Sequence, residues 1–260
     1  MGAVRGERAA EVAALRIGLD HGLTHIDTAE MYGDGGAEET VAAAIRDRRR
    51  ADLFIVSKVL PENASYRGTR RAAELSLRRL GTDYLDLYVL HWRARQPLGE
   101  TMRAMEDLVV AGTIRFLGVS NFDVADLEDA MAALRRERLA CNQVLYNLRQ
   151  RGIERDLIPF CRRHGIAVVG YTPYGGFPSS DSGAIQVLAG IGRTHGCSAR
   201  QVALAFLTRA EGVFAIPKAS TVEHVRENAG AGDLRLEESE CEAIDEVFPA
   251  PPRRVPLVMG

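Results

Sequence analysis

The chain has 260 residues, with 33 basic and 35 acidic side chains and a formal net charge of −2. This balance lacks the cationic excess that is typical of proteins binding nucleic acids or anionic membranes. The N-terminus has no apolar signal segment and no apolar run reaches membrane-spanning length, so we expect a soluble, cytoplasmic protein. Its four cysteines are widely spaced without zinc-site partners, which predicts reduced thiols and no metal.

Strand-like and helix-like segments alternate along the whole chain. Short runs rich in Val, Ile, Leu and Tyr, typical of buried parallel strands, lie at residues 23–29, 53–59, 84–92, 113–120, 140–146, 166–172 and 213–218. Amphipathic segments separate them, for example 70–81, where Gly81 predicts the helix end. The basic run at 46–50 is interpreted as a solvated helix end. Repeated βα units predict one domain over 1–260, with a tail at 249–260.

Two parallel-sheet architectures compete, a doubly wound sheet and a closed barrel. No G-x-G-x-x-G follows any predicted strand, which weakens the doubly wound alternative. Polar residues instead collect at the carboxyl ends of many strands, and a (β/α)₈ TIM barrel gathers such ends around one mouth. The polar strand ends are Asp27, Lys58, His91, Ser120, Asn121, Gln143, Tyr171 and Lys218. Only seven strands are visible where a barrel needs eight, so we expect a first strand upstream of Met1.

The chain contains two lysines, Lys58 and Lys218, and every other basic residue apart from histidine is arginine. Lys58 lies inside the apolar run LFIVSKVL, which otherwise indicates a buried strand. Lysine is a compact ammonium, whereas arginine spreads its charge over a wide fork. We therefore expect Lys58 to serve chemistry that needs a small cation close to another group.

The predicted partner is a tyrosine. Asp27, Tyr32, Lys58 and His91 would face one another across a barrel mouth. Tyrosine ordinarily has a pKa of about 10, too high for an efficient acid at neutral pH. An ammonium at ~4 Å favours the tyrosinate by ~4 kcal/mol at an effective dielectric constant of ~20. These residues therefore suit a tyrosine that donates a proton, with a carboxylate holding the lysine charged.

Seven motifs in this order resemble the aldo-keto reductases over nearly the whole chain, and the resemblance is closest to bacterial small reductases of the methylglyoxal-reducing type. The motifs are HIDTAEMYG (25–33), FIVSKV (54–59), LGTDYLDLYVLHW (80–92), GVSNF (118–122), NQVLYN (142–147), GYTPYGG (170–176) and IPKAS (216–220). The resemblance implies an NADPH-dependent reductase of small aldehydes or ketones. Separately, we expect a monomer or a weak oligomer, since the sequence has no heptads or evident interface stripe.

Residue roles follow from the same resemblance. Tyr32 would be the general acid, Lys58 its cationic neighbour, Asp27 the partner of Lys58, and His91 the group that places the carbonyl oxygen. Trp92 would line the substrate pocket. Cofactor contacts are implied for Ser120, Asn121, Gln143, Tyr171 and Thr172 at the nicotinamide end, for Lys218, Ser220, Thr221 and His224 near the 2′-phosphate, and for Glu227 and Asn228 at the adenine.

The chain departs from the commoner family pattern in two places. Many relatives carry arginine where this chain has His224, and histidine offers less charge at pH 7, so use of NADH is also open. Family members normally begin with a short hairpin and a first barrel strand, and the chain begins after that point. The natural polypeptide is therefore expected to start upstream of Met1.

Each site residue also has a purely structural interpretation. Asp27 could cap a turn, Lys58 could guard a sheet edge, and His91 and Tyr171 could be satisfied core residues. Ser120 with Asn121 could cap a helix, and Ser220 with Glu223 matches a capping box.

Two other functions also compete. One is an NADPH-binding accessory or redox-sensing protein with little turnover, and the other is a barrel isomerase that uses Lys58 as a Schiff base.

Overall fold

The computed structural model describes residues 8–93, 95–179, 182–219 and 221–260. The chain divides into two compact units, Met1–Asn142 and Gln143–Gly260, and strands alternate with helices through the described residues of both. No helix in the described ranges is long and apolar enough to cross a membrane.

The first unit contains four complete parallel strands, and helices pack against them. Its elements are α1 (Arg8–Asp20), β1 (His25–Asp27), α2 (Gly36–Ile45), η1 (Arg50–Asp52), β2 (Phe54–Val59), η2 (Pro61–Asn63), α3 (Tyr66–Leu80), β3 (Leu85–Leu90), α4 (Leu98–Val110), β4 (Ile114–Ser120) and α5 (Val124–Ala133). Strand β5 (Leu139–Leu145) crosses the boundary between the units.

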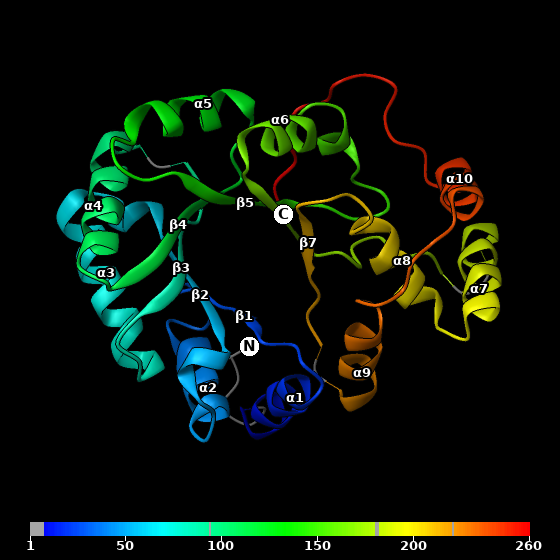
Figure 1. Ribbon diagram of the computed structural model, residues 1–260, viewed down its shortest axis with the longest axis horizontal. Helices are drawn as coiled ribbons and strands as arrows, with labels where there is room; N and C mark the ends of the chain where they lie inside the picture. The colour runs from blue at the N-terminus through cyan, green and yellow to red at the C-terminus, as the bar shows by residue number, and fades with distance from the viewer. Residues whose placement is uncertain (1–7, 94, 180–181, 220) are drawn as a thin grey trace. The chain divides into compact units, whose positions relative to one another are not determined.

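Strands β1 to β4 pair in chain order, and every pair is parallel. Lys58 of β2 lies opposite Val89 of β3, which in turn lies opposite Gly118 of β4. Helices α2, α3 and α4 follow one another along the outer side of these strands (Figure 1). Because parallel strands point the same way, the residues that end them lie along one edge of the sheet.

The predicted helix ending at Gly81 is confirmed. Ser65 caps the N-terminus of α3 by accepting from the backbone N–H of Gly68. Gly81 ends the helix with φ 64°, a left-handed conformation that glycine adopts without strain. All seven predicted strands are present, although several are shorter than their apolar runs. For example, the run at 23–29 forms a strand only over His25–Asp27.

The interpretation of residues 46–50 as a solvated helix end is wrong for Arg50. Its side chain is only 20% exposed and forms an ion pair of 2.8 Å with the fully buried Asp86 of β3. Its guanidinium also lies over the ring of Tyr84, 3.8 Å from the centroid. A buried carboxylate needs cationic partners, and no local pattern in the sequence indicates a partner so distant along the chain.

The second unit carries two parallel strands and five α-helices among its described residues. Its further elements are η3 (Gly152–Glu154), α6 (Leu157–His164), β6 (Ala167–Tyr171), α7 (Gly183–His195), α8 (Ala199–Leu207), β7 (Val213–Ile216), α9 (Val222–Gly230) and α10 (Glu238–Val247). Tyr171 at the end of β6 lies opposite Ile216 at the end of β7. Helix α7 packs on α8 and α10.

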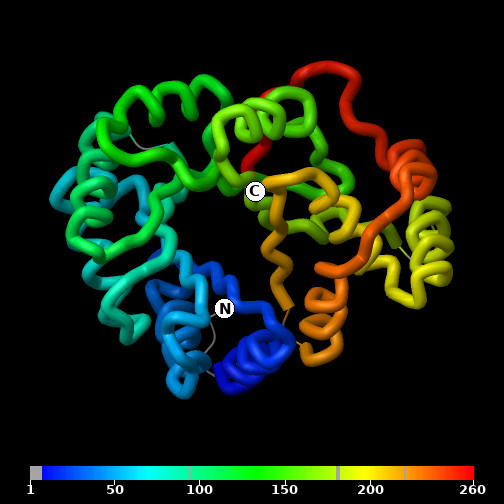
Figure 2. The backbone as a smooth tube through the Cα atoms, in the orientation of Figure 1, coloured from blue at the N-terminus to red at the C-terminus, as the bar shows by residue number. Residues whose placement is uncertain are grey.

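After α10 the C-terminal tail runs back across the second unit (Figure 2). Arg155 donates to the carbonyl oxygen of Pro251 at 2.7 Å, and Arg254 pairs with Asp156 at 2.6 Å. The backbone N–H of Gly260 donates to the hydroxyl of Tyr171 at 3.1 Å. The tail is therefore held along its length.

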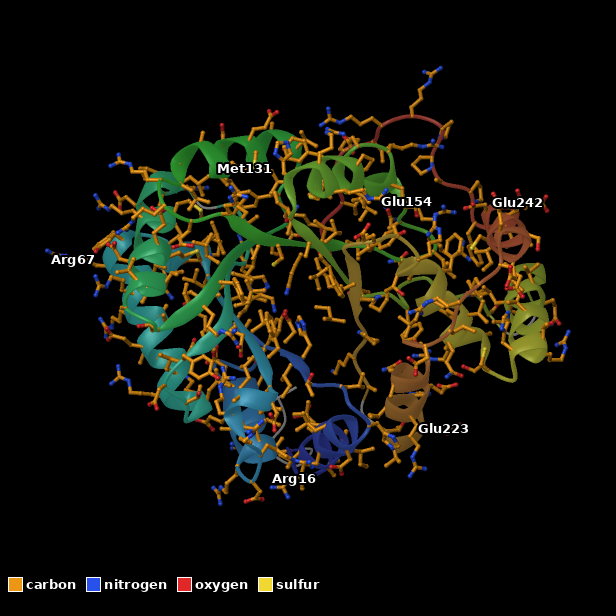
Figure 3. The ribbon with its side chains drawn as sticks, in the orientation of Figure 1. Arg16, Arg67, Met131, Glu154, Glu223 and Glu242 are labelled. Atoms are coloured by element: carbon orange, nitrogen blue, oxygen red, sulfur yellow. The ribbon has the colours of Figure 1, made fainter. Side chains whose placement is uncertain are left out.

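Glu154, labelled in Figure 3, is the centre of a polar network in the second unit. Its carboxylate accepts from the hydroxyl of Tyr146 at 2.6 Å and pairs with Arg151 and Arg209 at 2.7 Å and 3.2 Å. Arg151 is itself buried and also holds Asp245 of α10 at 2.6 Å. This network connects η3, Arg209 just after α8, and helix α10, and so fixes where the tail begins.

Candidate active site

Asp27 and Lys58 meet at the carboxyl edge of β1 and β2. Asp27 is the last residue of β1, and Lys58 is the last residue but one of the neighbouring strand. The Lys58 ammonium donates to the Asp27 carboxylate and, at 2.9 Å, to the carbonyl oxygen of Thr28. Lys58 is 1% exposed, so the pair lies almost entirely out of water. The two residues predicted to pair are therefore in contact.

Tyr32 completes the contact. It lies in the turn between β1 and α2, and its phenol oxygen accepts from the Lys58 ammonium at 3.4 Å. The ammonium nitrogen is 4.9 Å from the centroid of the tyrosine ring. Tyr32 itself is half-buried.

The environment keeps Lys58 protonated. Burial alone lowers the pKa of an ammonium, but the charges of Asp27 and Tyr32 and the hydrogen bonds to them outweigh burial, and the pKa of Lys58 is raised. An amine must lose its proton before it can attack a carbonyl carbon. The raised pKa therefore argues against the alternative in which Lys58 forms a Schiff base.

His91 follows β3 directly and stands beside Tyr32. The two rings meet edge to face with centroids 5.7 Å apart, and Trp92 lies against His91 at 4.9 Å. His91 is 7% exposed, and its Nδ1 atom has no hydrogen-bond partner among the described residues. Burial, followed by the charge of Lys58, lowers the pKa of His91 to about 4. His91 is thus a neutral imidazole near pH 7.

We expect the ring resonances of His91 to stay at their neutral positions as pH falls from 8 to about 5, and to move only on approach to about pH 4. An unfolded histidine binds its proton near pH 6.5. The free energy of unfolding should therefore fall as pH drops from about 6.5 to about 4, by at most about 3 kcal/mol from this residue. NMR titration of ring-labelled protein measures the ionisation directly. A His91 midpoint near 6.5 would contradict the expectation.

Ser120 and Asn121 tie the end of β4 to His91. The Asn121 side-chain amide donates to the carbonyl oxygen of His91 and to the hydroxyl of Ser120, each at 3.1 Å. Asn121 has φ 61°, and Thr172 in the second unit has φ 54°. Such left-handed backbone is uncommon outside glycine and gathers at functional sites. Both residues follow strands, at positions predicted to contact a cofactor.

The remaining predicted cofactor residues lie in the second unit. Gln143 is buried within β5, and Tyr171 is half-buried at the end of β6. Lys218 is exposed after β7, and Thr221 caps α9 by accepting from the backbone N–H of His224 at 3.3 Å. Glu227 and Asn228 lie in the last part of α9. Ser220 lies outside the described residues.

Several of the purely structural interpretations are wrong. Lys58 is buried within paired strands, so it does not guard a sheet edge. The N-cap of α5 is Asp123, which forms a capping box with Asp126, so Ser120 and Asn121 do not cap that helix. The N-cap of α9 is Thr221, and the capping box predicted from Ser220 and Glu223 involves Ser220, which lies outside the described residues.

Sequence reasoning also missed the roles of Glu30 and Arg200. Buried Glu30 accepts from the backbone N–H of Leu60 at 2.7 Å and from Asn63 at 3.0 Å, and so anchors the segment between Asp27 and Tyr32. The position of Glu30 inside the motif HIDTAEMYG could have indicated that it belongs to the candidate site. In the second unit, Arg200 lies over Tyr174, 3.6 Å from the ring centroid. No local pattern pointed to that pair.

Comparison with known proteins gives consistent matches. The sequence pattern of the "Aldo/keto reductase family" matches residues 3–248. Methylglyoxal reductase YeaE of Escherichia coli is 45% identical over 261 residues, which cover 100% of this chain and 92% of that protein. Glyoxal reductase of Bacillus subtilis is 34% identical, with coverage of 89% of this chain and 81% of that protein.

Solved structures agree with this match. An aldo-keto reductase from Klebsiella pneumoniae, crystallised in complex with NADPH, superposes with a TM-score of 0.93 at 48% identity and covers 100% of this chain and 92% of its own. A second structure of an aldo/keto reductase from Klebsiella pneumoniae, in complex with NADP and acetate, gives a TM-score of 0.91 with the same identity and coverage. This likeness confirms the predicted α/β fold of the (β/α)₈ class.

Proposed function

Since the chain belongs to the aldo/keto reductase family, and is thus an oxidoreductase, we propose that it reduces small aldehydes and ketones with NADPH. Methylglyoxal and related 2-oxoaldehydes are the proposed substrates, because the similar proteins from Escherichia coli and Bacillus subtilis are named for methylglyoxal and glyoxal. The single observation that carries the proposal is the buried Lys58 ammonium, in contact with both Asp27 and Tyr32.

The residues present suit a pyridine dinucleotide. At the end of β4 a hydroxyl and an amide, from Ser120 and Asn121, offer partners for a carboxamide. In the second unit, Tyr171 offers a half-buried ring for stacking. The exposed Lys218 precedes the N-terminus of α9, where backbone N–H groups and the Thr221 hydroxyl favour a phosphate. Each group of residues thus matches one part of the cofactor.

When bound, NADPH supplies the hydride that is transferred to the carbonyl carbon. Tyr32 then donates its phenolic proton to the carbonyl oxygen, which becomes the hydroxyl of the product alcohol. The Lys58 ammonium, 3.4 Å from the phenol oxygen, stabilises the phenolate that remains. Asp27 keeps Lys58 charged and in place, because its carboxylate accepts a hydrogen bond from the ammonium.

His91 has a different part in this proposal. Because its pKa is lowered to about 4, its ring is uncharged and can orient a substrate oxygen through one N–H without competing as an acid. The adjoining Trp92 offers an apolar wall for the rest of a small substrate. His224 is half-buried in α9 and gives less positive charge than arginine, so we propose that NADH is used as well as NADPH.

The proposal is tested by following NADPH absorbance with the purified chain and methylglyoxal, and by identifying the product by NMR. We expect one NADPH to be consumed for each hydroxyacetone or lactaldehyde formed. Glyoxal and a simple unactivated ketone, tested in parallel, establish whether the preference is for 2-oxoaldehydes. A folded chain that binds NADPH but turns over none of these carbonyls would contradict a reductase function and favour the accessory protein.

A further inference from the structure

We infer that Arg200, held against Tyr174, forms a stacking platform for the adenine ring of the cofactor. The inference rests on the proposed function, because it requires that a dinucleotide binds. It concerns residues of the second unit alone, and it adds to the site a residue that the family resemblance did not supply.

The platform is fixed in place by its neighbours. Arg200 lies in the first turn of α8, with its guanidinium carbon 3.6 Å above the centroid of the Tyr174 ring. The Tyr174 hydroxyl donates to the side-chain oxygen of Asn228 at 2.9 Å, and Asn228 is only 6% exposed. Burial raises the pKa of Tyr174 to about 12, so this ring remains neutral and keeps its hydrogen bond at physiological pH.

Part of the hydrogen-bonding capacity of the Arg200 guanidinium is unsatisfied among the described residues. Its Nε atom is buried and has no hydrogen-bond acceptor among the described residues. The Glu227 carboxylate is 3.7 Å away, close enough to attract the guanidinium but too far for a hydrogen bond. The side chain nevertheless keeps 28% of its surface exposed. The Phe177 ring is more distant, with its centroid 5.7 Å from the guanidinium carbon. A planar cation that is stacked on one tyrosine and partly accessible is suited to stack on another flat ring.

The surroundings point to the adenine of the cofactor. Glu227 and Asn228, which touch Arg200 and Tyr174, are the two positions for which the resemblance implies adenine contacts. A carboxylate and an amide can accept and donate along the edge of a purine, while the guanidinium covers its face. The negative charge of Glu227 also makes this spot less suitable for a phosphate dianion. Arg200 should therefore contribute equally to the affinity for NADPH and for NADH.

The test measures dissociation constants by fluorescence for NADPH, NADH and reduced nicotinamide mononucleotide, which lacks adenosine. In Arg200→Met we expect Kd for both dinucleotides to rise about tenfold, a typical effect of losing one base-stacking partner. Binding of the mononucleotide should not change. Arg200→Lys keeps the charge but loses the plane, and should weaken both dinucleotides similarly. Arg193→Met, an exposed arginine in α7, is the matched control and should bind all three normally.

Other outcomes would overturn the inference. A loss confined to NADPH would assign Arg200 to the 2′-phosphate, and full affinity in Arg200→Lys would show that charge alone matters. Unchanged Kd values in Arg200→Met would remove the residue from the site while leaving the proposed function intact. A wild-type chain that is folded but binds neither dinucleotide would instead overturn the proposed function itself, and this inference with it.

Discussion

Replacing Tyr32 by phenylalanine is expected to lower kcat for NADPH-dependent methylglyoxal reduction by about 10³-fold or more, within the range for loss of a positioned acid. The substitution removes only the hydroxyl that accepts from Lys58 at 3.4 Å and keeps the ring beside His91. Since hydride addition leaves a negative oxygen, the reaction then lacks its proton donor. Steady-state rates and single-turnover oxidation of bound NADPH measure the loss.

The control separates chemistry from folding. Tyr66 on α3 also has a bonded hydroxyl, which donates to Asp107 at 2.7 Å, but it lies outside the predicted site. Tyr66→Phe should therefore keep normal turnover. In Tyr32→Phe the Kd for NADPH should stay within about twofold of wild type, because the phenol is assigned no cofactor contact. Substantial turnover in Tyr32→Phe would show that another group supplies the proton.

The strands and the polar residues at their ends were predictable because both are local features of the sequence. A run such as FIVSKV must be buried, and in a parallel sheet the residue near its carboxyl end lies beside the equivalent residues of neighbouring strands. This argument alone brought Asp27, Lys58 and His91 to one edge. The proximity of Tyr32 depended in addition on the short turn after β1.

The contacts that were missed join residues far apart in sequence. The Arg50 and Asp86 ion pair connects η1 to β3, and Arg200 meets Tyr174 across the second unit. In both cases the arginine occurs in a segment whose local pattern explains it adequately as a helix end or a helix surface. The path of the tail was unpredictable for a similar reason, since its anchors, such as Asp156 and Tyr171, belong to other elements.

Replacing Lys58 by methionine is expected to lower kcat by up to about 10³-fold. An ammonium 3.4 Å from the phenol oxygen stabilises a phenolate by about 5 kcal/mol at an effective dielectric constant near 20, and this interaction exists only once Tyr32 has lost its proton. The same change leaves the Asp27 carboxylate without its ammonium, at a cost in folding free energy of about 3–5 kcal/mol. The single variant therefore mixes two effects.

The double variant Lys58→Met with Asp27→Asn separates them. Removing both charges takes away the buried ion pair as a unit, so urea unfolding should show much of the lost free energy recovered. Turnover should remain as low as in the single variant, because neither methionine nor asparagine can stabilise the phenolate. Recovery of stability together with turnover would mean that Lys58 only supports the fold. Recovery of stability without turnover would assign the lysine to proton transfer from Tyr32.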